Sequence, residues 1–334
     1  MIHLDNQSQE LLERILDVQS ESYNQDHMLD FIIEEATTIY PDALVEWDTY
    51  GNVYITKRTT VSDDLIVPAI VSHVDTVHRM IDDKDYRVLK FEVDGDCKYS
   101  AFNTKAMQST GIGGDDKCGI FVCLEALRHL DDVKVAFFKD EEVGCLGSAQ
   151  ADLTFFDDCG FVLQADRKGN HGIANGMSSC NVSSSEFQED VLAMSHSLGY
   201  SHFEFEDGGL TDVMELSANG LKLSVANFAC GYYSPHTDDE WISYNDLTAT
   251  AELMLNFATT NKKYEFEYEE IARPKYKYRS AYTGYNYKPT TVYNPSKEDV
   301  ESEDCMCTPD SVEKVIDSWD NTKWCLTCFK QINK

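Results

Sequence analysis

The sequence is poor in positive charge. It holds 28 lysines and arginines against 59 aspartates and glutamates, which gives a net charge of −31. A protein that binds nucleic acid needs a basic surface, and attachment to anionic lipid also needs clustered cations. We therefore expect neither nucleic acid nor a membrane surface as a partner of this chain.

The sequence also lacks a long apolar run. No stretch has the roughly 20 consecutive apolar residues that cross a bilayer. The first residues, MIHLDNQSQELLERILDVQSES, show neither a basic start nor an apolar stretch, so they do not resemble a secretory signal. We expect a cytoplasmic protein in which most of the 11 cysteines are buried, reduced thiols.

Short apolar runs are present, and each of them ends in polar residues. They are LIVPAIVSHVD (65–75), KVAFFKDEE (134–142), GFVLQADRKG (160–169) and LKLSVANFACGYYSPHTDDE (221–240). Helical spacing of apolar residues lies before and between them, over 9–39, 117–130, 190–200 and 246–260. Strands that alternate with helices predict an α/β fold, with a mostly parallel central sheet flanked by helices. Ligands bind such sheets at the carboxyl ends of the strands, where these polar residues fall.

Two clusters of polar residues stand out first. SHVDTVH (72–78) places His73 and Asp75 on one side of a strand end, because residues two apart in a strand share a face. Imidazole is a common metal ligand and a neighbouring carboxylate can orient it, although a hydrogen-bonded turn has the same pattern. GIGGDDKCGI (111–120) sets Asp115 and Asp116 side by side before a helix. A dication would hold both carboxylates ionised, whereas a helix N-cap explains only one of them.

Further acids and a histidine follow along the chain. KDEEVGCLGS (139–148) has Glu141 and Glu142 adjacent at a strand end. One such carboxylate can bind metal while its neighbour moves a proton; a solvated acidic loop is the alternative. Asp166 lies at the end of the third apolar run and His236 near the end of the fourth. Each of these two residues alone is compatible with a structural role.

Together the motifs resemble those of the co-catalytic di-zinc exopeptidases. The order His-x-Asp, Gly-x-Asp-Asp-Lys-x-Gly, Asp-Glu-Glu-x-Gly, Asp, His is similar to that of the peptidase T-like M20, M28 and M42 metallopeptidases, over roughly residues 9–258. The first three motifs are most like peptidase T. The segment from Gly208 to Glu240, with Thr211-Asp212 in a Gly-Thr-Asp-like turn, is more similar to M28 and M42 aminopeptidases. The resemblance implies a phosphorylase/hydrolase-like α/β core.

The resemblance also implies roles for individual residues. Five of them would hold two zinc ions: His73, Asp115 and Asp166 on the first, and Asp115, Glu142 and His236 on the second, with Asp115 shared. Cobalt or manganese would also suit this donor set. Glu141 would be the general base, and Asp75 would orient His73 or tune the first metal. In these families the peptide bond of the Asp-Asp pair is often cis.

The spacing of the motifs leaves little room for inserted domains. M20 enzymes usually carry a lid and dimerisation domain between their fourth and fifth motifs, but only 70 residues separate Asp166 from His236. M42 enzymes usually insert a domain between the first and second motifs; here 42 residues separate His73 from Asp115, enough for a small flap. We therefore expect a core without a separate lid domain, nearer to M28 in architecture. The oligomeric state stays open.

The C-terminal region has a different character. Cys305 and Cys307, followed by Cys325 and Cys328, resemble the spacing of a zinc ribbon or knuckle that would hold one structural zinc ion. SVEKVIDSW (311–319), between the pairs, predicts a short amphipathic helix. Free cysteines on a docked terminal segment are the alternative. We divide the chain into a catalytic domain (1–262), a linker or surface strap (263–300) and a small cysteine-rich extension (301–334).

These features predict a zinc metallo-exopeptidase that hydrolyses short peptides, with an aminopeptidase as the leading interpretation. The same site would cleave other amides, so a metal-dependent amidase or deacylase, or a carboxypeptidase, acting on N-acyl amino acids or dipeptides is an alternative. A non-catalytic binding protein on this fold is a third interpretation. The complete set of ligand and base positions argues against it, because a scaffold used only for binding has no need of them.

Overall fold

The computed structural model describes residues 1–60, 62, 65–177, 180–267, 314–316 and 323–325. Residues Met1–Pro274 belong to one compact unit and Lys275–Lys334 to a second. The predicted boundary of the catalytic domain, after residue 262, falls just inside the first unit. None of the helices formed by the described residues is both long enough and apolar enough to cross a membrane.

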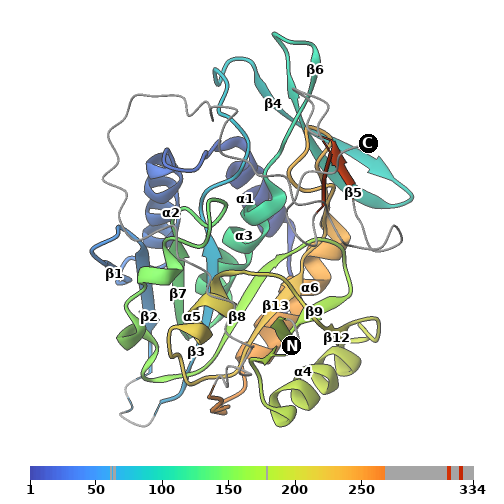
Figure 1. The fold of residues 1–334 in the computed structure, drawn as a ribbon. Helices are drawn as coiled ribbons and strands as arrows, with labels where there is room; N and C mark the ends of the chain where they lie inside the picture. The colour runs from blue at the N-terminus through green and yellow to red at the C-terminus, as the bar shows by residue number, and fades with distance from the viewer. Residues whose placement is uncertain (61, 63–64, 178–179, 268–313, 317–322, 326–334) are drawn as a thin grey trace, which may run out of the picture. The chain divides into compact units, whose positions relative to one another are not determined.

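An eight-stranded sheet forms the centre of the first unit (Figure 1). Its strands, in spatial order, are β1 (Leu44–Trp47), β2 (Val53–Arg58), β7 (Asp132–Phe138), β3 (Val67–His73), β8 (Cys159–Arg167), β13 (Val225–Ala229), β9 (Gly172–Ala174) and β12 (Glu204–Glu206). The four middle strands, β7, β3, β8 and β13, run parallel to one another. Antiparallel pairing occurs toward the two edges, at β1–β2, β2–β7 and β13–β9. The predicted mostly parallel centre is confirmed.

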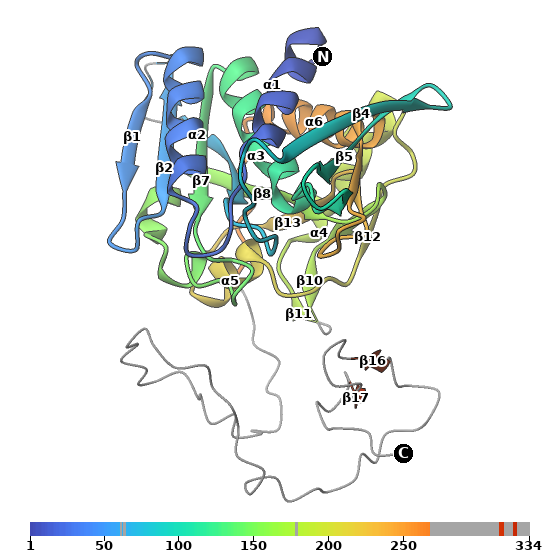
Figure 2. The same ribbon diagram turned by 90° about the horizontal axis from the view of Figure 1, so that it is seen from above.

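Helices cover both faces of this sheet (Figure 2). They are α1 (Asn6–Asp17), α2 (Asp26–Ile39), α3 (Gly114–His129), α4 (Ser185–Leu198), α5 (Asp212–Ala218) and α6 (Tyr244–Ala258), with short 3₁₀ turns η1 (Ser148–Gln150) and η2 (Leu153–Phe156). Because side chains alternate along a strand, Ile70 of β3 packs in the core beneath α1, α2, α3 and α6. The next residue, Val71, packs on the other face with α5.

The ends of the helices follow from local sequence signals. Asp5 caps α1 and forms a capping box with Ser8. Ser184 caps α4, and Gly199, with a positive φ, ends it. The helix α2 stops at Ile39, two residues before Pro41, as predicted. The helix α5 was not predicted, because seven residues are too few to show a helical period.

A smaller sheet comes from two separate parts of the chain. The strands β4 (Tyr86–Val93), β5 (Asp96–Asn103) and β6 (Gln108–Thr110) fill the interval between His73 and Asp115, where a small flap was expected. Asp94 and Gly95, both with positive φ, make the tight turn between β4 and β5. The strands β14 (Tyr232–Tyr233) and β15 (Trp241–Ser243) join this sheet through β5. The flap therefore lies against the loop that carries His236.

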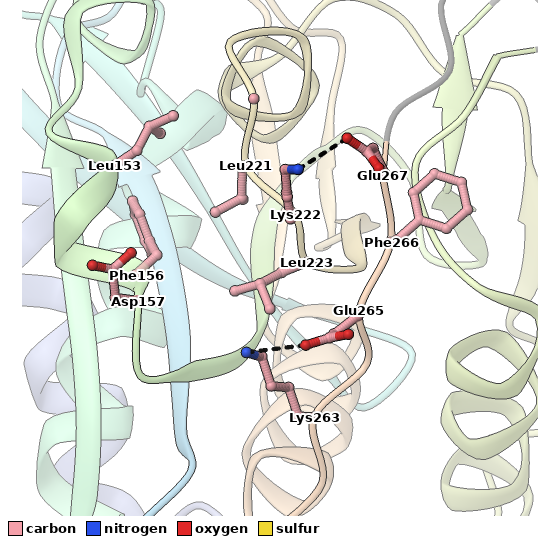
Figure 3. Close-up of a pocket in the computed structure, with 11 residues that line it drawn as sticks. Leu153, Phe156, Asp157, Leu221, Lys222, Leu223, Lys263, Glu265, Phe266 and Glu267 are labelled. Atoms are coloured by element: carbon pink, nitrogen blue, oxygen red, sulfur yellow. Dashed lines mark ion pairs between the residues drawn. The ribbon is translucent and has the colours of Figure 1, made fainter.

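The amino-terminal edge of the parallel strands carries a cavity of about 500 Å³ (Figure 3). Leu153, Phe156 and Leu223 line it, and ion pairs Lys222–Glu267 (3.0 Å) and Lys263–Glu265 (3.3 Å) lie on its rim. Tyr264, in the predicted linker, packs its ring against Phe161, Phe187 and Phe257 of the core. This edge lies opposite the predicted site, because the site residues follow the carboxyl ends of the same strands.

The cysteine pattern is described only in part. All seven cysteines among the described residues of the first unit are free, and all but Cys97 are buried, in agreement with the predicted buried thiols.

Two further pairs of short antiparallel strands are present. One pairs β10 (Gly176–Met177) with β11 (Cys180–Asn181), and the other pairs β16 (Lys314–Ile316) with β17 (Lys323–Cys325).

The predicted helix over 311–319 is wrong at Lys314–Ile316, which form the strand β16. Val315 and Ile316 are β-branched residues, whose stiff side chains favour strands over helices. Cys325 is the last residue of β17 and pairs in register with Lys314. Cys305, Cys307 and Cys328 lie outside the described residues, so the zinc ribbon stays a prediction.

Candidate active site

The predicted site residues come together at the carboxyl ends of the parallel strands. His73 is the last residue of β3, and Asp166 is the last residue but one of β8. Glu141 and Glu142 follow β7 after a two-residue link, Asp115 is the second residue of α3, and His236 lies in the loop between β14 and β15. Parallel neighbouring strands end at one edge of the sheet, which is why residues so far apart in the sequence meet there.

Asp115 lies between the two histidines. Its Oδ1 is 3.1 Å from Nε2 of His73, and its Oδ2 is 3.2 Å from Nε2 of His236. Burial opposes ionisation of Asp115, but the hydrogen bonds to His236 and His73 outweigh it and hold the pKa of Asp115 well below its usual range. The carboxylate is therefore ionised and presents one oxygen to each imidazole.

Two groups of acids flank Asp115. On the His73 side, Oδ1 of Asp166 lies 3.6 Å and Oε2 of Glu141 lies 3.8 Å from Nε2 of His73. On the His236 side, Oε2 of Glu142 lies 3.2 Å from Nε2 of His236. Ligand atoms of His73, Asp115 and Glu142 all lie within 4.8 Å of one another. The structure thus brings all five predicted ligand residues and the predicted base into one cluster.

The electrostatics of the cluster show a shortage of positive charge. Burial and the neighbouring Asp115 raise the pKa of Asp166 well above its usual value. Hydrogen bonds to Asp115 and Glu142 raise the pKa of His236 to about 10. Oε1 of Glu142 is buried and has no hydrogen-bond partner among the described residues. Crowded carboxylates, one of them with a raised pKa, together with an unpartnered buried oxygen, fit a site built around cations.

Asp116 has a different role from Asp115. Its Oδ2 accepts hydrogen bonds from the Ser72 hydroxyl (2.7 Å) and the His73 N–H (3.2 Å), and its Oδ1 accepts one from the Gly119 N–H (2.9 Å). Both oxygens are therefore occupied by protein donors, and burial raises the pKa of Asp116. Asp116 ties the start of α3 to the end of β3. The peptide bond between Asp115 and Asp116 is cis, as the resemblance implied.

Asp75 holds the loop with the two glutamates. Its oxygens accept hydrogen bonds from the N–H groups of Glu141 (2.9 Å) and Glu142 (3.3 Å) and from the Ser22 hydroxyl (2.7 Å). Nδ1 of His73 donates to the backbone oxygen of Asp75 at 2.9 Å, which leaves Nε2 facing the acids. Burial opposes ionisation, but these bonds and His73 lower the pKa of Asp75. Asp75 thus contacts the imidazole through its backbone oxygen and the backbone of both glutamates through its carboxylate.

The side chain of Glu141 is largely buried. Its Oε1 accepts a hydrogen bond from the Cys145 thiol at 3.3 Å. Burial, with a smaller contribution from Asp212, raises the pKa of Glu141 to about 7, although His73 opposes the shift. A carboxylate that titrates near neutrality can both accept and return a proton at physiological pH.

Sequence reasoning missed a second group of residues that supports Asp166. Gln164 Nε2 donates to Oδ2 of Asp166 (3.2 Å) and to Oδ2 of Asp212 (3.0 Å), and the Tyr232 hydroxyl donates to Oδ1 of Asp166 (3.3 Å). Burial raises the pKa of Asp212 to about 6. Gln164 lies two residues before Asp166 on the same strand face, so its position was a usable signal. Asp212 lies in the Gly-Thr-Asp-like turn that the sequence analysis noted.

Sequence reasoning also missed Glu240, which is fully buried beneath the site. Its Oε2 accepts hydrogen bonds from the Gly113 N–H (2.8 Å) and from Nε2 of His78 (2.8 Å), and its Oε1 accepts one from the Asp115 N–H (3.2 Å). One side chain therefore joins the loops that carry His73, Asp115 and His236. A Cβ at Gly111 would overlap the His78 ring, so the glycine leaves space for it.

Comparisons with known proteins concern the fold that carries this site. No protein-family model matches the chain, and no curated protein sequence matches it. Among solved structures, aminopeptidase PepT from Bacillus cereus superposes with a TM-score of 0.62 at 14% identity, over 75% of this chain and 97% of that one. A tripeptidase from Staphylococcus aureus superposes with a TM-score of 0.61 at 13% identity, over 78% of this chain and 100% of that one.

An aminopeptidase from the archaeon Desulfurococcus kamchatkensis gives a TM-score of 0.57 at 14% identity, over 77% of this chain and 96% of that one. The TET1 peptidase of Pyrococcus horikoshii gives a TM-score of 0.52 at 14% identity, over 75% of this chain and 99% of that one. That peptidase can assemble into a tetrahedron or a large octahedral shell. The chain has the fold of the M20 and M42 exopeptidases. The resemblance stated from the motifs is confirmed at the level of the fold, and the roles of the site residues stay predictions.

Proposed function

We propose that this protein is a metallo-exopeptidase that hydrolyses short peptides and acts as an aminopeptidase. The observation that carries the proposal is the position of Asp115 between His73 and His236, with acids on both flanks. The fold, which it has in common with several solved aminopeptidases, supports a peptidase over other hydrolases.

We assign two zinc sites to these residues. His73, Asp115 and Asp166 would hold one ion, and Asp115, Glu142 and His236 the other. Imidazole and carboxylate donors suit zinc and also accept cobalt or manganese. The unpartnered Oε1 of Glu142 supports the second site. Asp116 is not assigned as a ligand, because protein donors occupy both of its oxygens.

The mechanism assigns the proton transfers to Glu141. When bound, the ions supply Lewis acidity toward the scissile carbonyl and make water more acidic. Glu141, at the edge of the ligand cluster, would accept the proton of the attacking water and pass it to the leaving amine. Asp75 fixes the backbone of Glu141 through the 2.9 Å hydrogen bond, so the base stays in place during both transfers.

The test compares two neighbouring glutamates. Glu141→Gln should keep two zinc ions per chain, by elemental analysis, and lower kcat by about 10²- to 10⁴-fold, since general-base catalysis contributes that range. Glu142→Gln, the matched control, should lose zinc. An unchanged rate in Glu141→Gln would remove the base assignment, and full zinc retention in Glu142→Gln would remove that ligand.

The type of exopeptidase is tested by mass spectrometry. A model peptide with distinguishable ends is incubated with the zinc-loaded protein beside its N-acetylated form. Stepwise loss from the free amino terminus, blocked by acetylation, is the expected result. Loss from the other end indicates a carboxypeptidase. If both peptides remain intact, the aminopeptidase proposal fails, and release of the acyl group from N-acyl amino acids would then indicate a deacylase.

A further inference from the structure

A cavity of about 630 Å³ opens beside His236. Three segments line it: the loop after β3, the β5–β6 hairpin of the flap, and the loop of His236 itself. The His236 side chain is about half exposed, at 52%. Pockets of a few hundred cubic ångströms hold small ligands, so this cavity has room for the part of a substrate that extends beyond the reacting bond.

Arg79 supplies a free positive charge to this cavity. It lines the wall and is exposed, and it makes no hydrogen bond or ion pair with any residue in the described part of the chain. Three other cations near the site already have partners: Lys117 donates to two backbone oxygens, Lys139 pairs with Asp26, and Arg167 pairs with Glu206. The chain has a net charge of −31, so an arginine at the mouth of this acidic site that has no partner among the described residues can attract an anionic group.

The loop that carries Arg79 is held on both sides. Before Arg79, His78 donates to the buried Glu240 at 2.8 Å. After it, the Met80 N–H donates to the Glu21 carboxylate (3.2 Å), and the Ile81 N–H donates to Oε1 of Gln19 (2.9 Å). Arg79 is therefore presented from a fixed backbone, which reduces the entropy lost when a ligand binds it.

We infer that this cavity is the subsite for the leaving-group end of the substrate, and that Arg79 binds its free carboxylate. The inference rests on the proposed function and names its substrate class: short peptides that end in a free carboxyl group. The planar guanidinium matches a carboxylate in a bidentate arrangement. It would repel the free ammonium of a peptide, so the amino-terminal residue belongs on the acidic side of His236. Asp238, the acid on the same wall, forms no ion pair with Arg79 in the described structure.

The experiment compares trialanine with trialanine amide, which differ only in the terminal charge. For the wild-type protein, kcat/KM should be about 10- to 100-fold higher for the free acid, mainly through KM, as expected for a charged hydrogen bond. In Arg79→Ala this preference should disappear because the acid loses affinity and the amide does not. Arg79→Lys should restore part of it. Arg87→Ala, an exposed arginine on β4 that does not line the cavity, should keep the full preference.

A binding measurement separates this inference from the proposed function. Calorimetry with zinc-loaded Glu141→Gln needs no turnover, and it should detect the acid more tightly bound than the amide, with the difference lost in Glu141→Gln/Arg79→Ala. Equal binding and equal kcat/KM for acid and amide would overturn the subsite while leaving a peptidase in place. Arg79-dependent binding of the acid without cleavage of either peptide would support the subsite and refute the peptidase.

Discussion

Replacing Glu240 tests whether the loop of Asp115 is held by a side chain far from it in sequence. Glu240→Ala removes a fully buried carboxylate and leaves the N–H groups of Gly113 and Asp115 without their acceptor. It also releases His78. The loop that places Asp115 between the histidines would then lose its support from below.

The size of the loss in stability follows from the two N–H groups that are left without an acceptor. Each buried N–H left without a partner costs about 1–3 kcal/mol, so Glu240→Ala should lower the free energy of unfolding by about 2–6 kcal/mol. The lower end applies where water enters the vacated space. Glu240→Gln retains the shape and one acceptor oxygen, and should cost about 1–2 kcal/mol. The total free energy of unfolding of a domain is only about 5–15 kcal/mol, so the loss of stability in the alanine variant should be easy to measure.

The assay is urea unfolding at fixed zinc concentration, combined with zinc stoichiometry and turnover on a short peptide at a temperature where each variant is folded. We expect wild type to be the most stable, Glu240→Gln to be intermediate and Glu240→Ala to be the least stable. Zinc affinity and kcat should fall in the same order. Asp239→Ala, at an exposed neighbouring acid, is the matched control and should resemble wild type. Wild-type stability and turnover in Glu240→Ala would refute the reasoning.

Three more predictions concern the same site. Gly119→Ala should destabilise the protein by about 1–3 kcal/mol in urea unfolding, although alanine normally favours a helix, because its Cβ would lie 2.4 Å from both Asp116 oxygens; a more stable variant would contradict the packing. Asp75→Asn should weaken zinc binding about 10- to 100-fold in a chelator competition while the fold persists; unchanged affinity would show that Asp75 does not orient the ligands. Zinc at 100 times its Kd should stabilise the metal-free protein by about 2.7 kcal/mol for each site that it fills, and an unfolding midpoint that does not change with zinc concentration would argue against a metal centre.

Much of the site could be predicted because its residues follow apolar strands. The runs before His73, Glu141 and Asp166 are continuous and apolar, which is typical of buried parallel strands. Such strands end at a common edge, so their terminal residues converge without any knowledge of the three-dimensional contacts. The ordered motifs then added Asp115 and His236, which the structure places in the same cluster.

The supporting residues could not be predicted in the same way. Glu240 meets the Gly113 N–H across 127 positions of the chain. Tyr232 reaches Asp166 across 66 positions, and Ser22 reaches Asp75 across 53. No periodicity joins such pairs, and each residue alone has the appearance of an ordinary surface or core residue in the sequence. The prediction of short elements failed for a related reason. The helix α5 and the strand β16 are too short for a period of 3.6 or 2 residues to be recognised.

The sequence by itself determined the class of fold and the chemical types at the site, because helix and strand periods are local and are repeated often enough to be recognised. The choice of Asp115 over Asp116 as the metal ligand came only from the family resemblance. The tertiary structure decided which oxygens face the histidines, which donors occupy Asp116, and which loops Glu240 joins. These depend on the lateral order of the strands and on burial, which set hydrogen-bond partners and the pKa of Glu141 through contacts that are distant in the chain.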